Sequence, residues 1–190
     1  MNHSYSNYEV YTSRTKNDPN ADSKNSFLQK VKFNDVSGDR LKIISRQSMN
    51  GFINTIYYNF EELSEYPQLK HTVQEIGRLL TSSGLVMFTV SLKDVMIGYC
   101  IGEMMKLDDE RNVLFISYIF VSKKYRGDGI GSIFIKDCVE YAKQKGLEAI
   151  VLICDTEDQK VLDFYLKKGF MYDLKLRRYD KYDVLSLNIN

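Results

Sequence analysis

The stretch Tyr118-Ile-Phe-Val-Ser-Lys-Lys-Tyr-Arg-Gly-Asp-Gly-Ile-Gly-Ser132 indicates both a local fold and a ligand. An apolar strand runs into a loop with glycines at 127, 129 and 131, and an amphipathic helix follows at once. Glycines let a backbone approach a ligand closely, and a helix start leaves N–H groups unpaired beside a partial positive charge. The stretch therefore predicts a loop that binds a pyrophosphate, with Arg126 adding charge at its rim.

Known phosphate-binding patterns narrow this prediction. A Walker A loop needs a lysine directly after its last glycine, and none follows Gly131. A dinucleotide fingerprint needs G-x-G-x-x-G, whereas Gly127, Gly129 and Gly131 give G-x-G-x-G. The pattern that fits is R-x-x-G-x-G, formed by Arg126, Gly129 and Gly131. On the loop alone, a tight glycine turn without a ligand is the alternative.

Apolar periodicity predicts the elements on both sides of the loop. Before it we expect a first strand at 27–33 or 41–44, a helix over 49–63, a second helix from Pro67 to Leu80, a hairpin of strands 85–92 and 95–107, and a central strand 113–121. After it we expect a helix that Gly146 ends, a strand 149–154, a helix with a capping box at 156–159, and strands 170–176 and 182–189. This order predicts a mixed α/β (α+β) sheet with helices on its faces.

Composition limits the class of protein. The chain has 190 residues, of which 44% are hydrophobic, enough for one domain with a sizeable core. Its 26 Lys and Arg nearly balance its 25 Asp and Glu, so no overall field draws it to nucleic acid or to an anionic membrane. Its first residues lack the apolar region of a signal peptide, and no apolar run approaches about 18 residues. We therefore expect a cytoplasmic protein.

The sequence also argues against a metal site and sets a domain boundary. Cys100, Cys138 and Cys154 show no C-x-x-C spacing and lie among apolar residues, so we expect buried, reduced thiols. His3 and His71 are far apart, so no His/Cys metal site is expected. Residues 1–26 are polar and predict a disordered tail, which leaves 27–190 as a single domain.

The loop and a second motif resemble one family. R-x-x-G-x-G is similar to the coenzyme A pyrophosphate loop of the GNAT N-acetyltransferase superfamily. Downstream, Asp158-x-x-Val161-x-x-Phe164-Tyr165-Leu-Lys-Lys-Gly169-Phe170 resembles its second signature, in which an Asn, a small residue and a Tyr precede Gly-Phe. The resemblance covers residues 84–190 well. It implies a mostly antiparallel, twisted sheet of six to seven strands, flanked by about four helices and splayed at an acetyl-CoA site.

The resemblance implies acetyl-CoA as co-substrate, without a metal. The pantetheine arm would lie along Ile119, Phe120 and Val121, and a backbone N–H of Phe120 or Val121 would stabilise the oxyanion. The remaining contacts implied for the coenzyme are the pyrophosphate loop residues Arg126, Gly127, Asp128, Gly129, Ile130, Gly131 and Ser132, together with Asp158. Asp158 replaces the family Asn and could instead serve the helix N-terminus.

Two residues are implied for catalysis. Tyr165 matches the family tyrosine that protonates the departing thiolate, although it could simply pack in the core. The fourth strand of the family often carries a glutamate, whereas this chain has no carboxylate there. Glu103 in the neighbouring strand is therefore the best remaining carboxylate for a general base, while Ser117 or Tyr118 could instead hold a relay water.

The resemblance implies an enzyme that moves acetyl directly from acetyl-CoA onto a primary amine. Residues 176–183 join the last two strands, where the family shapes its acceptor site, and their tyrosines and mixed charges suit a protein or peptide amine. A small-molecule amine of the polyamine or aminoglycoside type is one alternative. A non-catalytic coenzyme A-binding module is another, and monomer and dimer are both open.

Overall fold

The computed structural model describes residues 26–36, 46–60, 70–176 and 182–189. The predicted tail, except for Ser26, lies outside the described residues. The alternative first strand at 41–44 and the predicted helix start at Pro67 also lie outside them.

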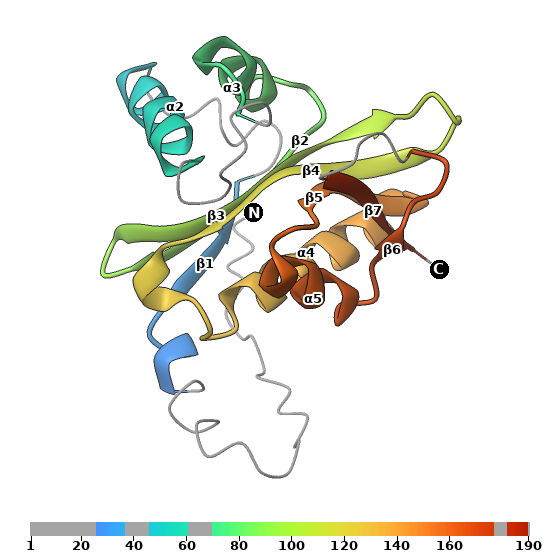
Figure 1. Ribbon diagram of the computed structural model, residues 1–190. Helices are drawn as coiled ribbons and strands as arrows, with labels where there is room; N and C mark the ends of the chain where they lie inside the picture. Colours follow the sequence, from blue (N-terminus) through green and yellow to red (C-terminus); the bar gives the residue numbers. More distant parts are fainter. Residues whose placement is uncertain (1–25, 37–45, 61–69, 177–181, 190) are drawn as a thin grey trace.

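A sheet of seven strands forms the centre of the fold (Figure 1). Its spatial order is β1-β2-β3-β4-β5-β7-β6, and only the β4–β5 pair is parallel. The strands are β1 (Lys32–Asp35), β2 (Leu85–Leu92), β3 (Val95–Lys106), β4 (Asn112–Val121), β5 (Ala149–Asp155), β6 (Met171–Tyr172) and β7 (Tyr182–Asn188). The predicted mixed and mostly antiparallel sheet is confirmed.

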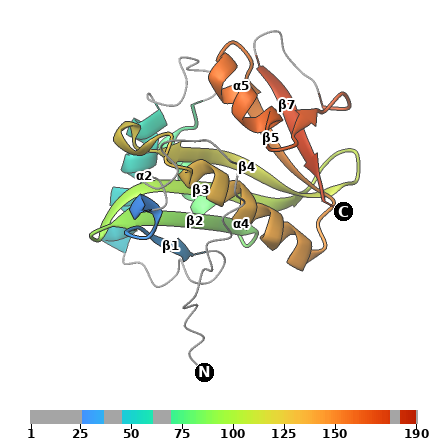
Figure 2. The ribbon, with the colours of Figure 1, turned by 90° about the horizontal axis from the view of Figure 1, so that it is seen from below.

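Helices cover both faces of this sheet (Figure 2). On one face, α2 (Arg46–Asn59) and α3 (Val73–Leu80) pack on β2, β3 and β4 through a core that includes the fully buried Ile56. On the other, α4 (Ile130–Lys145) and α5 (Gln159–Leu166) contribute to the main core, where Phe134 is fully buried. The short helix η4 (Lys123–Tyr125) links β4 to the glycine loop. No helix in the described part of the chain is long and apolar enough to cross a membrane.

Two predicted helix starts are wrong. Lys70–Thr72 are not helical, so α3 does not begin at Pro67. It begins after Thr72, which forms a capping box with Glu75. The cap of α5 is Asp158 rather than Thr156, because the Asp158 carboxylate accepts the N–H groups of Lys160 and Val161 at 3.0 and 3.2 Å. A single carboxylate thus satisfies two backbone donors that a helix start leaves unpaired.

The strand boundaries differ from the prediction at the two edges of the sheet. β1 begins only at Lys32, because the chain around Phe27 forms a helical turn. β6 is reduced to two residues that pair with β7. The central hairpin is as predicted, and its turn residues Lys93 and Asp94 both have positive φ.

β4 and β5 separate part of the way along their length. Their ladder runs only from Val113 opposite Ala149 to Ile116 opposite Leu152. Beyond it, β4 continues beside β3 as far as Val121, while β5 stays paired with β7. The predicted splay of the sheet therefore lies at the end of β4 that leads into the glycine loop.

A β-bulge in β4 decides which way its later side chains point. Ile116 pairs with Gly102 and Tyr118 pairs with Ile101, so Ser117 is the extra residue. Because side chains alternate along a strand, Tyr118 would share the face of Ile116 without the bulge. With the bulge, Tyr118 packs on the α2–α3 side, whereas Ile116 packs in the main core.

Replacing Gly102 by Ala should destabilise the protein. A Cβ atom on Gly102 would lie 2.3 Å from the carbonyl oxygen of Phe115, so the bulged backbone would have to move. Overpacking of this kind costs about 1–3 kcal/mol of unfolding free energy, measurable by urea denaturation. Gly51→Ala is the matched control, because its Cβ would meet nothing within 4 Å and a helical Ala is favoured over Gly. Equal stability of the two variants would contradict the prediction.

Candidate active site

A cleft of about 800 Å³ opens where β4 and β5 separate. Its lining comes from β4, the loop after η4, the start of α4, the end of β5 and α5. Of the residues predicted to hold the coenzyme or act on it, those that line this cleft are Ile119, Val121, Arg126, Gly127, Gly129, Ile130, Gly131, Ser132, Asp158 and Tyr165. Phe120, Asp128 and Glu103 are not part of its lining.

The glycine loop presents backbone donors to the cleft. Gly127 and Gly129 have φ values of +88° and +90°, a conformation that other residues rarely adopt. Gly129 is the N-cap of α4, and no side chain caps that end. The first N–H groups of the helix are therefore available to an anion, and the donor set fits a pyrophosphate.

Gly131 has a different role from the other two glycines. A Cβ atom there would approach the ring of Phe164 to 3.2 Å, so this glycine lets α4 pack closely against α5. Arg126 lies at the other side of the loop, where its Nε donates to the carbonyl oxygen of Val121 at 2.8 Å. This bond places the guanidinium between the end of β4 and the glycine loop.

The splayed edge of β4 offers further backbone groups. The Ser122 N–H donates to the carbonyl of Ile97 at 2.9 Å, and hydrogen-bonded pairs alternate along an antiparallel ladder. The Phe120 N–H is therefore directed to β3, and its ring stacks on Tyr99 away from the cleft. The N–H groups of Ile119 and Val121 face the gap. Of the two predicted oxyanion donors, only Val121 has the required direction.

Tyr165 lies in the wall of the cleft that α5 provides. Its ring contacts Phe164 and Phe170, at centroid distances of 5.1 and 5.5 Å. Burial raises the pKa of its phenol well above the usual value, and the nearby thiol of Cys154 raises it further. Cys154 also lines the cleft, and burial raises its pKa to about 12. This part of the cleft therefore disfavours an unpaired negative charge.

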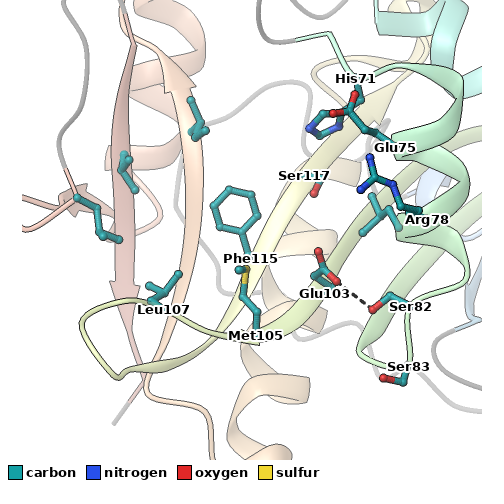
Figure 3. A pocket seen from close by; sticks show the side chains of 14 residues that line it. His71, Glu75, Arg78, Ser82, Ser83, Glu103, Met105, Leu107, Phe115 and Ser117 are labelled. Carbon is teal, nitrogen blue, oxygen red and sulfur yellow. Dashed lines mark hydrogen bonds between the residues drawn. The ribbon is translucent and has the colours of Figure 1, made fainter.

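A groove of about 760 Å³ lies beside the cleft (Figure 3). The two hollows share His71, Phe115, Ser117 and Ile153, so they meet at the bulge of β4. Glu103 belongs to the groove, where its carboxylate accepts a hydrogen bond from Ser82 Oγ at 2.9 Å. The predicted base thus lies beside the cleft rather than in it.

His71 and Tyr118 form a pair where cleft and groove meet. Nδ1 of His71 lies 2.5 Å from the Tyr118 hydroxyl. Burial lowers the pKa of His71 below 6.5, against the opposite effect of Glu75, and burial raises the pKa of Tyr118. At neutral pH the imidazole is therefore uncharged and the phenol protonated, an arrangement that can accept one proton. Among the described residues, no group of three or more His, Cys, Asp or Glu could hold a metal.

Sequence reasoning missed this pair. The two residues are 47 positions apart, and the sequence suggests no role for His71 beyond that of a metal ligand, which its distance from His3 argues against. For Tyr118 the sequence suggests only that it could hold a relay water. The one available signal was the T-x-x-E pattern at 72–75, which places His71 directly before a helix N-cap.

Sequence comparisons identify similar proteins. A sequence model of the acetyltransferase (GNAT) family matches residues 52–170. An uncharacterized N-acetyltransferase of Methanocaldococcus jannaschii is 37% identical over 62 residues, which cover 33% of this chain and 27% of that protein. N-alpha-acetyltransferase 30 of Schizosaccharomyces pombe is 29% identical over 65 residues, which cover 34% of this chain and 43% of that protein. The matched segments thus span less than half of either relative.

Solved structures share the fold over most of the chain. The NatC complex bound to Gag peptide and CoA matches with a TM-score of 0.65 at 16% identity, covering 85% of this chain and 99% of that one. An aminoglycoside acetyltransferase from an uncultured soil metagenomic sample matches with a TM-score of 0.58 at 15% identity, covering 80% of this chain and 95% of that one. Both are likenesses of fold.

Replacing Glu75 by Gln should lower the pKa of His71 further. The negative charge of Glu75 favours the imidazolium, and glutamine removes that charge while it can still complete the capping box. NMR titration of the ring protons measures the pKa in both proteins. A raised or unchanged pKa in the variant would contradict this reading of the site.

The same pKa sets the direction of a pH effect on stability. Folded His71 binds its proton more weakly than unfolded His71, whose ordinary pKa is 6.5. The contribution of His71 to the unfolding free energy is therefore complete above pH 6.5. It is lost as the pH falls from 6.5 through the lower pKa of the folded state. His71→Gln should therefore reduce the loss of unfolding free energy on acidification, which urea denaturation at a series of pH values measures.

Proposed function

Because the chain belongs to the acetyltransferase (GNAT) family, we propose that it transfers the acetyl group of acetyl-CoA to a primary amine of a peptide or protein. One observation carries the proposal. A continuous hollow runs from the uncapped start of α4, past Tyr165, to the His71–Tyr118 pair, and there it meets a second groove. A coenzyme and an amine acceptor can thus reach the same point from different sides.

The coenzyme would bind along the cleft through backbone groups. The N–H groups of Gly129, Ile130 and Gly131 would hold its pyrophosphate, with Arg126 at the side. The unpaired edge of β4 at Ile119 and Val121 suits the amides of a pantetheine arm. Asp158 already accepts two N–H groups of α5, so its main role is as a helix cap.

The acceptor must lose a proton before it can attack. An ammonium has no lone pair, and the His71–Tyr118 pair supplies the proton acceptor. Tyr118 takes the proton while its own passes to Nδ1 of His71, which becomes an imidazolium that Glu75 stabilises. If Nδ1 of His71 already carries a proton, the ammonium proton passes directly to Nε2, and the same imidazolium results. The pair ends one proton richer and later returns that proton to solvent.

The amine nitrogen then forms its bond to the acetyl carbon, and the carbon–sulfur bond breaks. The Val121 N–H would stabilise the charge that develops on the carbonyl oxygen. Tyr165 would give its proton to the departing sulfur, and the second proton lost by the nitrogen would restore the phenol. Burial raises the pKa of the neighbouring Cys154 thiol to about 12, so a thiolate that leaves in the same surroundings would be strongly basic and its protonation would be favoured.

The pKa of His71 supports an α-amine over a lysine or polyamine. A peptide α-amine has a pKa of about 8, so about one tenth is already neutral at pH 7, whereas a lysine amine of pKa about 10.4 is almost entirely charged. Because the pKa of His71 lies below 6.5, this base removes a proton more easily from the α-ammonium than from a lysine ammonium. The local sequence match to an N-alpha-acetyltransferase supports the same choice.

Release of the coenzyme A thiol tests the proposal. The purified protein is mixed with acetyl-CoA and with peptides, spermidine or an aminoglycoside, and mass spectrometry locates the acetyl group. We expect α-amine acetylation of peptides. Transfer to spermidine or the aminoglycoside alone would favour the small-molecule alternative. Coenzyme binding without transfer to any amine would identify a non-catalytic module.

Tyr165→Phe should lower kcat about 10²-fold, because the proton donor to sulfur is lost. KM for acetyl-CoA should change little, since the phenyl ring keeps its contacts with Phe164 and Phe170. Steady-state kinetics separates the two constants. An unchanged kcat would assign Tyr165 to packing alone.

Tyr118→Phe should lower kcat at neutral pH by about 10² or more, and activity should recover partly at high pH, where the amine is already neutral. Glu103→Gln is the contrasting variant, because Glu103 lies in the groove and bonds Ser82. It should raise KM for the acceptor while kcat is largely kept. The reverse result, with kcat lost only in the Glu103 variant, would restore Glu103 as the base.

A further inference from the structure

Within residues 26–36, 46–60, 70–176 and 182–189, no helix covers one part of the sheet. On the face that carries α2 and α3, these helices pack on β2, β3 and β4. A separate apolar cluster on β4, β5 and β7, centred on Val151 and Val184, includes no helix residue within the described chain. Ile153 is 44% exposed beside it. In Figure 1, α2 and α3 stand over the other half of the sheet.

The groove uses this uncovered face as one of its walls (Figure 3). Phe115, Ile153, Leu176 and Val184 make that wall apolar. The opposite wall comes from the segment before α3, from α3, from the loop after it and from β3. It includes the apolar Leu79 and Met105, but most of its side chains are polar: His71, Glu75, Arg78, Ser82, Ser83 and Glu103. The groove is therefore amphipathic across its width.

The charges of the polar wall suit a single cation. Glu75 and Glu103 oppose Arg78, and the low pKa of His71 leaves it neutral, so one negative charge is in excess. Ser82 orients the Glu103 carboxylate. A polyamine or aminoglycoside carries several cations, and the apolar wall provides no partner for the others.

We propose that this groove binds the first residue of an acceptor peptide and selects an apolar first side chain. This inference rests on the proposed function. In an N-terminal residue the ammonium and the side chain leave the same Cα atom in different directions. The ammonium then faces Glu103 and the His71–Tyr118 pair, while the side chain covers Phe115, Ile153, Leu176 and Val184. An Asp or Lys in first place would bring a charge against that wall.

A peptide panel that differs only in its first residue tests the selection in the unmodified protein. With acetyl-CoA saturating, we expect kcat/KM for Leu and Met peptides to exceed that for Asp and Lys peptides at least about tenfold. Equal rates, or a preference for Lys or spermidine, would overturn the inference and leave the acetyl transfer intact. No transfer to any peptide would overturn both.

A pair of leucine variants tests the wall itself. Leu176 lines the groove, whereas Leu174, two residues earlier, is 81% exposed and does not. Leu176→Glu should lower kcat/KM for the Leu peptide about tenfold, mainly through KM, and reduce the discrimination against the Lys peptide. Leu174→Glu should match the wild type. Equal kinetics of the two variants would overturn the role of this wall.

Discussion

Hydrogen bonding between β4 and β5 ends at Ile116 and Leu152, and the site is built from what this separation exposes. A strand edge that loses its partner inside a protein must find other partners for its N–H and C=O groups. Arg126 satisfies one of them by donating to Val121. The other groups face a cleft whose far end is the uncapped start of α4. A long ligand with amides and phosphates meets both requirements.

The bulge at Ser117 brings together the two side chains that we propose as the proton acceptor. It turns Tyr118 to the face where α3 begins, and the capping box of Thr72 and Glu75 fixes that helix start directly after His71. The hydroxyl and the imidazole therefore meet without any motif that joins them. The nearby carboxylate of Glu103 accepts a hydrogen bond from Ser82, and in the function we propose it attracts the ammonium of the acceptor.

The pKa shifts in the cleft share one main cause, burial. Burial keeps Tyr118, Tyr165 and Cys154 protonated and His71 unprotonated, so each group is held in its neutral form. Such surroundings suit a reaction between a neutral amine and a neutral thioester, in which charge appears only as bonds change. Charged side chains lie in the glycine loop, at the end of β5 and the start of α5, and in the polar wall of the groove.

By itself, the sequence determined the glycine loop, the helix after it, the central hairpin and the candidate role of Tyr165. Each depends on residues close together in the chain, where periodicity, glycine conformations and turns act locally. It left the cap of α5 open between Thr156 and Asp158, because the two caps look alike in sequence. Only the tertiary structure decided which N–H groups of β4 face the cleft, the position of Glu103 and the His71–Tyr118 pair. These depend on strand register and on one bulge, and a shift of a single residue in either turns every following side chain to the opposite face.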